Sequence, residues 1–163
     1  PAVRMAADAL KELGMHRDGV QLIVSGGIRS GADVAKAIAL GADAVSIGTA
    51  ALIALGDNNP DLEDEYKKIG TKPGFYDEWQ AGNDPAGITT QDEKLASRLD
   101  PQIGGEKLAN YLKVLTLEAQ TLARACGKSH IRNLEPEDLN ALTLEASAMA
   151  RVPLAGTDWI PGK

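Results

Sequence analysis

The sequence lacks several features that would place it in well-defined protein classes. Its 163 residues include a single cysteine, Cys126, so the chain cannot form an internal disulfide or supply the several thiolates of an iron–sulfur cluster. Lys and Arg (17) are fewer than Asp and Glu (23), which argues against a nucleic-acid or anionic-membrane partner. The longest uncharged stretch, 44–56, is shorter than the roughly 18–20 residues of a membrane span, and we expect no signal peptide. We therefore expect a cytoplasmic, soluble protein.

What is present indicates a globular α/β protein. Hydrophobic residues make up 44% of the chain and charged residues 25%, which suits a domain with a core. Apolar spacing predicts helices at 1–13, 30–40 and 50–55, and strands at 20–24 and 44–47. A helix between two strands makes them parallel neighbours, and the branched run at 20–24 is typical of a buried strand. Ser30 is the expected N-cap of the second helix, with Asp33 in its first turn.

The rest of the chain divides into a loop-rich part and a helical part. Residues 57–91 are rich in Gly and Pro, which predicts a functional loop or an ordered arm, and its aromatic residues favour the arm. The acidic run 57–65 is interpreted as a solvated face. An apolar seam at 108–126 predicts a long helix with Cys126 buried as a small hydrophobe. A second helix is predicted at 136–149, beginning with proline.

Two glycine-containing segments carry the chemistry that the sequence offers. Each stands at the end of a predicted strand and just before a helix, and together they comprise Ser25, Gly26, Gly27, Ile28, Arg29, Ile47, Gly48 and Thr49. Glycine allows a ligand to approach the backbone, while free N–H groups and the helix dipole attract an anion. The loops after the last two strands of eight-stranded β/α barrels form a phosphate site of this kind. The alternative is that the glycines serve ordinary turns, and that Arg29 neutralises a neighbouring carboxylate rather than a phosphate.

Segments 22–28 and 41–49 resemble the end of the FMN-binding synthase domain of the glutamate synthase family, and 84–92 resembles the segment that follows it. The resemblance implies an α/β fold: the last two β/α units of a TIM-type barrel, a loop arm and C-terminal helices. The implied boundaries are 1–56 for the barrel part, 57–103 for the arm and 104–163 for the helical extension. It also implies that the eight residues above bind the phosphate of FMN.

One departure separates this chain from glutamate synthase proper. The family pattern carries three cysteines for a 3Fe–4S cluster, and Asp57 and Asp84 stand where the flanking cysteines would be. Carboxylates do not replace thiolates in iron–sulfur chemistry, so we expect no cluster from this chain. Residues 130–159 look most like the large subunit of the cluster-free N-methylglutamate synthases.

The resemblance implies glutamate or N-methylglutamate synthesis, with FMN passing a hydride. The implied partners are the remaining N-terminal barrel segment or subunit and a glutamine amidotransferase-like subunit, in an oligomer. Catalytic residues are expected on strands outside this sequence, and no metal site is expected. Two alternatives remain: a phosphate-binding barrel without flavin, like IMP dehydrogenase and GMP reductase, for which Cys126 stands in the wrong context, and a non-catalytic assembly fragment.

Neither histidine is expected to carry chemistry. His16 lies in a polar turn and is predicted to be exposed to solvent. His130 is interpreted as a loop histidine bonded to the backbone, with a ligand contact as the alternative.

Overall fold

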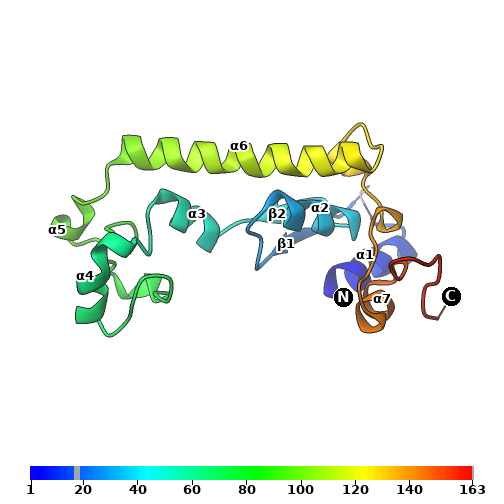
Figure 1. The fold of residues 1–163 in the computed structure, drawn as a ribbon, viewed down its shortest axis with the longest axis horizontal. Coiled ribbons are helices and arrows are strands. Elements are labelled where there is room, and N and C mark those ends of the chain that lie inside the picture. Colours follow the sequence, from blue (N-terminus) through cyan, green and yellow to red (C-terminus); the bar gives the residue numbers. More distant parts are fainter. Residues whose placement is uncertain (17–18, 163) are drawn as a thin grey trace. The chain divides into compact units, whose positions relative to one another are not determined.

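The computed structural model describes residues 1–16 and 19–162 (Figure 1). The chain forms two compact units, one of Pro1–Ile47 with Val114–Lys163 and one of Gly48–Lys113. The three-part division expected from the sequence stays a prediction.

The first unit contains a small parallel sheet and helices that precede and follow its strands. Its elements are α1 (Ala2–Glu12), β1 (Ile23–Ser25), α2 (Gly31–Ala39), β2 (Ala44–Ser46), the later part of α6 (Pro101–Ala125), the single-turn helices η3 (Ile131–Asn133) and η4 (Pro136–Asp138), and α7 (Leu144–Ala150). β1 and β2 pair in parallel, with Ile23 opposite Ala44 and Ser25 opposite Ser46. The predicted pair of parallel strands joined by a helix is confirmed, and the fold is mixed α/β and rich in helix.

The strands are shorter and more exposed than the sequence predicts. β1 begins at Ile23, and Val20 makes only an isolated bridge with His16. The side chain of Ile23 is 64% exposed, so the predicted burial of this strand is wrong for the described residues. Two strands alone bury little of each other's side chains.

A capping box and an apolar face hold α2 in place. Ser30 Oγ accepts a hydrogen bond from the Asp33 N–H, and the Asp33 carboxylate accepts one from the Ser30 N–H at 3.1 Å, as predicted. The buried residues of the helix are Gly31, Val34, Ala35, Ala37, Ile38 and Ala39. A hydrogen bond from the Arg29 N–H is the main cause that holds the pKa of Asp33 below its usual range. The ionised cap therefore stabilises the fold at neutral pH, and this contribution is lost as the pH falls through the folded-state pKa.

The face that α6 buries agrees with the predicted seam only in part. In the first unit the buried residues are Leu115, Ala119 and Ala123, which follow one another at intervals of one helical turn. Leu122 is 37% exposed and Cys126 is exposed, so the predicted burial of Cys126 is wrong. The buried face is the one that meets α2, where Gly31 approaches the backbone of Leu115 and Ala119.

Gly31 is the residue of α2 that makes this close contact possible. A Cβ built on Gly31 would lie 2.4 Å from the carbonyl oxygen of Leu115 and 2.5 Å from the amide nitrogen of Ala119. We therefore expect Gly31→Ala to lower the free energy of unfolding by about 2 kcal/mol through overpacking.

Gly105→Ala provides the matched control, because a Cβ built on Gly105 within α6 meets nothing within 4 Å. This exchange is expected to be neutral or to stabilise the helix by up to about 1 kcal/mol. Thermal unfolding of the two variants measures the difference. Equal melting temperatures would contradict the close approach of α6 and α2.

The predicted helix at 136–149 is wrong. After one turn, η4, the chain becomes extended at Leu139 (ψ 144°), and Ala141 bridges Leu154 in parallel. Thr143 then caps α7, because its side chain accepts a hydrogen bond from the Ala146 N–H. The helical spacing of the apolar residues therefore runs through two separate helical segments.

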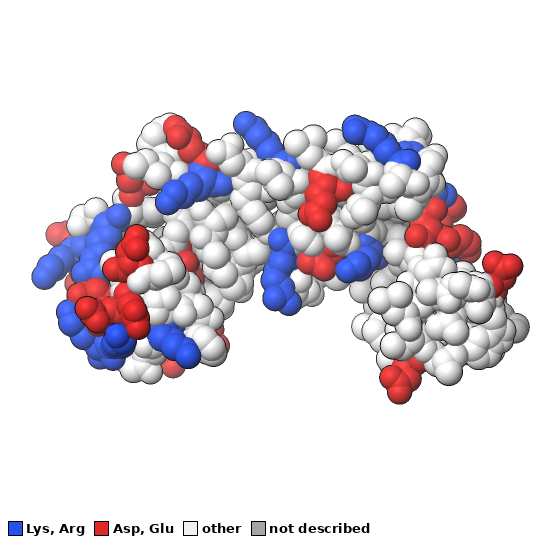
Figure 2. Space-filling model, in the orientation of Figure 1, with Lys and Arg blue, Asp and Glu red and all other residues white. Residues whose placement is uncertain are grey.

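The second unit contains the predicted arm. Its elements are α3 (Thr49–Leu55), the single-turn helix η1 (Pro60–Leu62), α4 (Glu63–Lys68), the single-turn helix η2 (Trp79–Ala81), α5 (Glu93–Ala96) and the start of α6. α3 was predicted, but α4 lies in the stretch interpreted as loop. Ion pairs one turn apart, such as Lys67 with Glu63 at 3.0 Å and Lys68 with Glu65 at 2.7 Å, stabilise this short helix. Figure 2 shows acidic and basic side chains interspersed over it.

None of the helices in the described part of the chain is long and apolar enough to cross a membrane.

Candidate functional site

The loop that follows β1 presents backbone rather than side chains to its surroundings. Gly26 and Gly27 have φ values of +101° and +72°, in the region that favours glycine. A Cβ built on either residue meets nothing within 4 Å. Ser25, both glycines and Arg29 are exposed, whereas Ile28 is buried. The loop is therefore anchored by Ile28 and open to close approach at the two glycines.

Two N–H groups of this loop find no acceptor in the part of the chain that the structure describes. Among the residues that the structure describes, none accepts a hydrogen bond from the backbone N–H of Gly27 or Ile28. Neighbouring N–H groups in a glycine turn form an anion-binding concavity. The loop thus has the donors and the space that the predicted phosphate site requires.

The N-terminus of α2, by contrast, is already occupied by carboxylates. Asp33 accepts hydrogen bonds from the N–H groups of Arg29 and Ser30, each at 3.1 Å. Glu118 of α6 accepts one from the Gly31 N–H at 2.6 Å. Two carboxylates therefore lie at this helix end, where negative charge is favourable, and the expectation that the helix end attracts the phosphate stays a prediction.

The second predicted segment follows β2. Ser25 and Ser46 are partners in the sheet, so the C-terminal ends of both strands, with Gly26 and Ile47 next in the chain, lie side by side in the first unit. Gly48 and Thr49 begin the second unit. Gly48 has a φ of −113°, outside the left-handed region, and a Cβ built on it meets nothing within 4 Å. The roles of all eight predicted residues in binding stay a prediction.

A buried carboxylate organises the start of the arm. Asp57 is 2% exposed, so its assignment to a solvated acidic face is wrong. It accepts hydrogen bonds from the Asn58 N–H at 2.8 Å, from Asn58 Nδ2 at 3.1 Å and from Trp79 Nε1 at 2.8 Å. Asn58 Oδ1 in turn accepts the N–H groups of Gly74 and Tyr76 at 2.8 and 3.0 Å. This network joins parts of the arm that are distant in sequence.

Two tyrosines pack beside this network and order the arm. The rings of Tyr66 and Tyr76 lie 5.7 Å apart between centroids, and both residues are buried. Burial is the main cause that raises the pKa of each hydroxyl. Phe75, by contrast, is 67% exposed. Two of the aromatic residues in 57–91 are therefore packed, whereas Phe75 is not, and the interpretation of this stretch as an ordered arm stays a prediction.

A second buried carboxylate, Asp84, holds the next turn of the arm. It is fully buried and accepts the N–H groups of Ala86 and Ile88 at 2.9 Å and of Thr89 at 3.0 Å. An aspartate before Pro85 and a glycine is typical of such turns, so the sequence did carry a signal for this role. Like Asp57, it serves hydrogen bonding within the arm.

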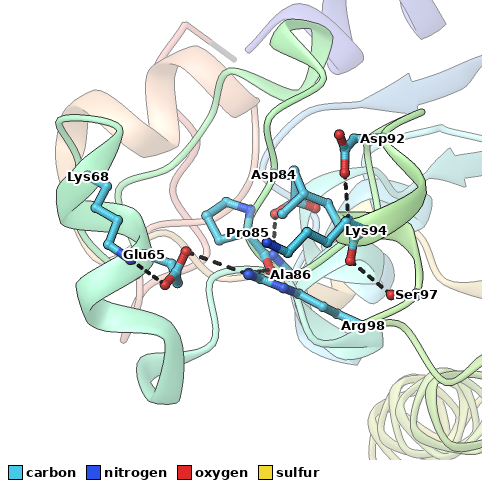
Figure 3. A network of polar contacts seen from close by, with 10 residues as sticks. Glu65, Lys68, Asp84, Pro85, Ala86, Asp92, Lys94, Ser97 and Arg98 are labelled. Atoms are coloured by element: carbon cyan, nitrogen blue, oxygen red, sulfur yellow. Dashed lines mark hydrogen bonds and ion pairs between the residues drawn. The ribbon is translucent and has the colours of Figure 1, made fainter.

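An ion-pair network lies next to this turn. Figure 3 shows Arg98 reaching the Pro85 carbonyl, to which Nη1 donates at 2.8 Å, and Glu65, which lies 3.6 Å from Nη2. The hydrogen bond from Lys68 is the main cause that lowers the pKa of Glu65. The network connects α4 to the turn at Asp84.

Both histidines lie within hydrogen-bond distance of backbone groups. His16 is half-buried and lies with Nε2 3.3 Å from the Gly41 carbonyl, so its predicted exposure to solvent is wrong. His130 Nδ1 accepts the Arg132 N–H at 3.0 Å, which confirms the backbone-bonded interpretation. Across the described residues, no group of three or more His, Cys, Asp or Glu side chains is arranged to hold a metal ion.

Comparison with known proteins gives a family match. The family described as "Conserved region in glutamate synthase" matches residues 2–59 and 79–129. A "Glutamate synthase large subunit-like protein" of Rhizobium meliloti (strain 1021) is 71% identical over 161 residues, which is 99% of this chain and 36% of the relative. No solved structure matches the chain.

More distant relatives cover less of the chain. An archaeal glutamate synthase (NADPH) of Methanocaldococcus jannaschii is 41% identical over 133 residues, 82% of this chain and 23% of the relative. An archaeal-type glutamate synthase (NADPH) of Thermotoga maritima is 40% identical over 133 residues, which is again 82% of this chain and 23% of the relative. The chain thus spans between about a quarter and about a third of these curated relatives.

Proposed function

Because this chain belongs to the glutamate synthase family, we propose that it is the C-terminal part of an FMN-dependent glutamate synthase-like enzyme. In this proposal, β1, α2, β2 and α3 are the last two β/α units of a TIM-type barrel. Their part in the enzyme is to bind the FMN phosphate. The observation that carries the proposal is the open loop after β1, with the unpaired N–H groups of Gly27 and Ile28.

The residues of this loop fit a phosphate group. Gly26 and Gly27 leave space at the backbone, and the N–H groups of Gly27 and Ile28 are the donors that would hold phosphate oxygens. When bound, FMN supplies hydride transfer. Ser25, Arg29, Ile47, Gly48 and Thr49 complete the proposed site. In this proposal the backbone of this chain holds the phosphate, and the rest of the barrel supplies the ring and substrate walls.

We propose further that the enzyme is of the cluster-free, N-methylglutamate synthase type. With one cysteine, the chain cannot ligate a cluster by itself. Asp57 and Asp84 are used for hydrogen bonds within the arm. The proposed partners are the N-terminal barrel segment and a glutamine amidotransferase-like subunit, in a cytoplasmic oligomer. Family membership favours this proposal over the purine nucleotide oxidoreductase alternative.

Gly48→Val tests the phosphate site. A side chain at Gly48 meets no protein atom within 4 Å and needs no left-handed φ. The bulk would obstruct a ligand that approaches the backbone. We expect FMN retention by the full-length protein to fall about tenfold after desalting, from loss of close backbone contact.

Gly105→Val is the matched control, because its surroundings are equally open and it lies within α6, outside the proposed site. Flavin content per chain is measured for both variants and the wild type. Undiminished flavin in Gly48→Val, or an equal loss in both variants, would reject Gly48 as part of the site.

A further inference from the structure

Glu118 joins α6 to the start of α2 across a long interval of sequence. Its Oε2 accepts the Gly31 N–H at 2.6 Å, and the two residues are 87 positions apart. They meet because Gly31 has no side chain to separate the helices: a Cβ there would strike the backbone of Leu115 and Ala119. Leu115 and Ala119 are themselves buried, and Glu118, next to Ala119 in the helix, is exposed beside them while its Oε2 accepts the Gly31 N–H.

This contact lies next to the loop that carries the unpaired N–H groups. Only Arg29 and Ser30 separate Ile28 from Gly31 in the chain. The Asp33 carboxylate accepts hydrogen bonds from the N–H groups of both intervening residues. Asp33 belongs to α2 itself and moves with the helix. Glu118 is the side chain that fixes the first residue of α2 to another element.

We propose that Glu118 is a positioning residue for the phosphate loop, a role that rests on the proposed function. Its carboxylate fixes the start of α2, and so aligns the N–H groups of Gly27 and Ile28 toward one phosphate. It does not touch the ligand. Because Glu118 takes the Gly31 N–H and Ser30 Oγ takes the Asp33 N–H, binding of the phosphate in this proposal depends mainly on the loop N–H groups and on their alignment.

The test compares FMN with riboflavin, which has the same ring system but no phosphate. Both are titrated by fluorescence into the flavin-free full-length protein and three variants. Glu118→Gln keeps an acceptor for the Gly31 N–H, Glu118→Asp keeps the charge but is one methylene shorter, and Glu118→Ala has neither. The control is Glu106→Ala, an exposed glutamate on the same helix.

We expect the alanine and aspartate variants to lose about tenfold in FMN affinity, the order of one charge-assisted hydrogen bond. The riboflavin affinity of both variants stays within about twofold of that of the wild type. The ratio of FMN affinity to riboflavin affinity therefore falls. Glu118→Gln and Glu106→Ala keep the wild-type ratio. A fold defect would weaken both ligands together, so the ratio of the two affinities separates positioning from general destabilisation.

Three results would overturn the inference. If the alanine and glutamine variants both bind FMN more tightly while aspartate behaves as the wild type, Glu118 acts through charge alone. If the affinities for FMN and riboflavin fall by the same factor in the variants, Glu118 has only a structural role. If the wild type binds FMN no better than riboflavin, the proposed function itself fails, and that result is seen before any variant is examined. If Glu118→Ala does not fold, the comparison of Glu118→Asp with Glu118→Gln tests the positioning role.

Discussion

The isolated 163-residue chain is expected to bind FMN at least about a thousandfold more weakly than the full-length protein, because a ligand pocket normally buries most of its ligand. In the proposed arrangement this chain offers only the phosphate end. The ring-binding walls belong to the remaining barrel. The exposed side chains of Ile23 in β1 (64%) and Ile53 in α3 (52%) are apolar surfaces that the missing strands and helices would cover.

Titration of FMN into the isolated chain, with and without the upstream segment added in trans, measures this difference. Addition of the segment is expected to restore quenching of flavin fluorescence and to reduce self-association of the chain. Tight binding of FMN by a monomeric isolated chain would show that the site is complete within these residues. It would contradict the proposal that this chain holds only the phosphate end of the site.

Asp84→Ala is expected to lower the free energy of unfolding of the arm by about 3 kcal/mol, because buried donors left without an acceptor cost about 1–3 kcal/mol each. The substitution leaves the N–H groups of Ala86, Ile88 and Thr89 unpaired around a fully buried position. Hydrogen exchange at these three amides measures the local opening directly. Exchange there is expected to accelerate more than elsewhere in the protein.

Asp64→Ala is the control, because the Asp64 side chain is 90% exposed and pairs only with Lys67 at 3.5 Å among the described residues. Such surface pairs contribute about 0–1 kcal/mol. If both aspartate variants exchange at the wild-type rate at these three positions, the buried carboxylate does not hold the turn.

The parts of the fold that the sequence predicted correctly depend on local signals. The capping box of Ser30 and Asp33 lies within four consecutive residues, and the parallel strand pair follows from the short helix between two branched runs. The glycine loop after β1 was found for the same reason, since its conformation is a property of Gly26 and Gly27 themselves.

The parts that the sequence missed depend on contacts between distant residues. Spacing alone does not decide which side of α6 is buried, because that side is set by its contact with Gly31. The burial of Asp57 depends on Trp79, which is remote in sequence. Glu118 carries no local signal at all, since an isolated glutamate in a long helix is usually a solvated residue.

The central claim is that these residues hold the phosphate of a bound FMN, and extraction of the flavin from purified full-length protein tests it most directly. The extracted cofactor is identified by chromatography and counted against protein. The account predicts about one FMN per chain, the value for one largely preformed site. A protein that contains no flavin, or that contains FAD in place of FMN, would contradict it.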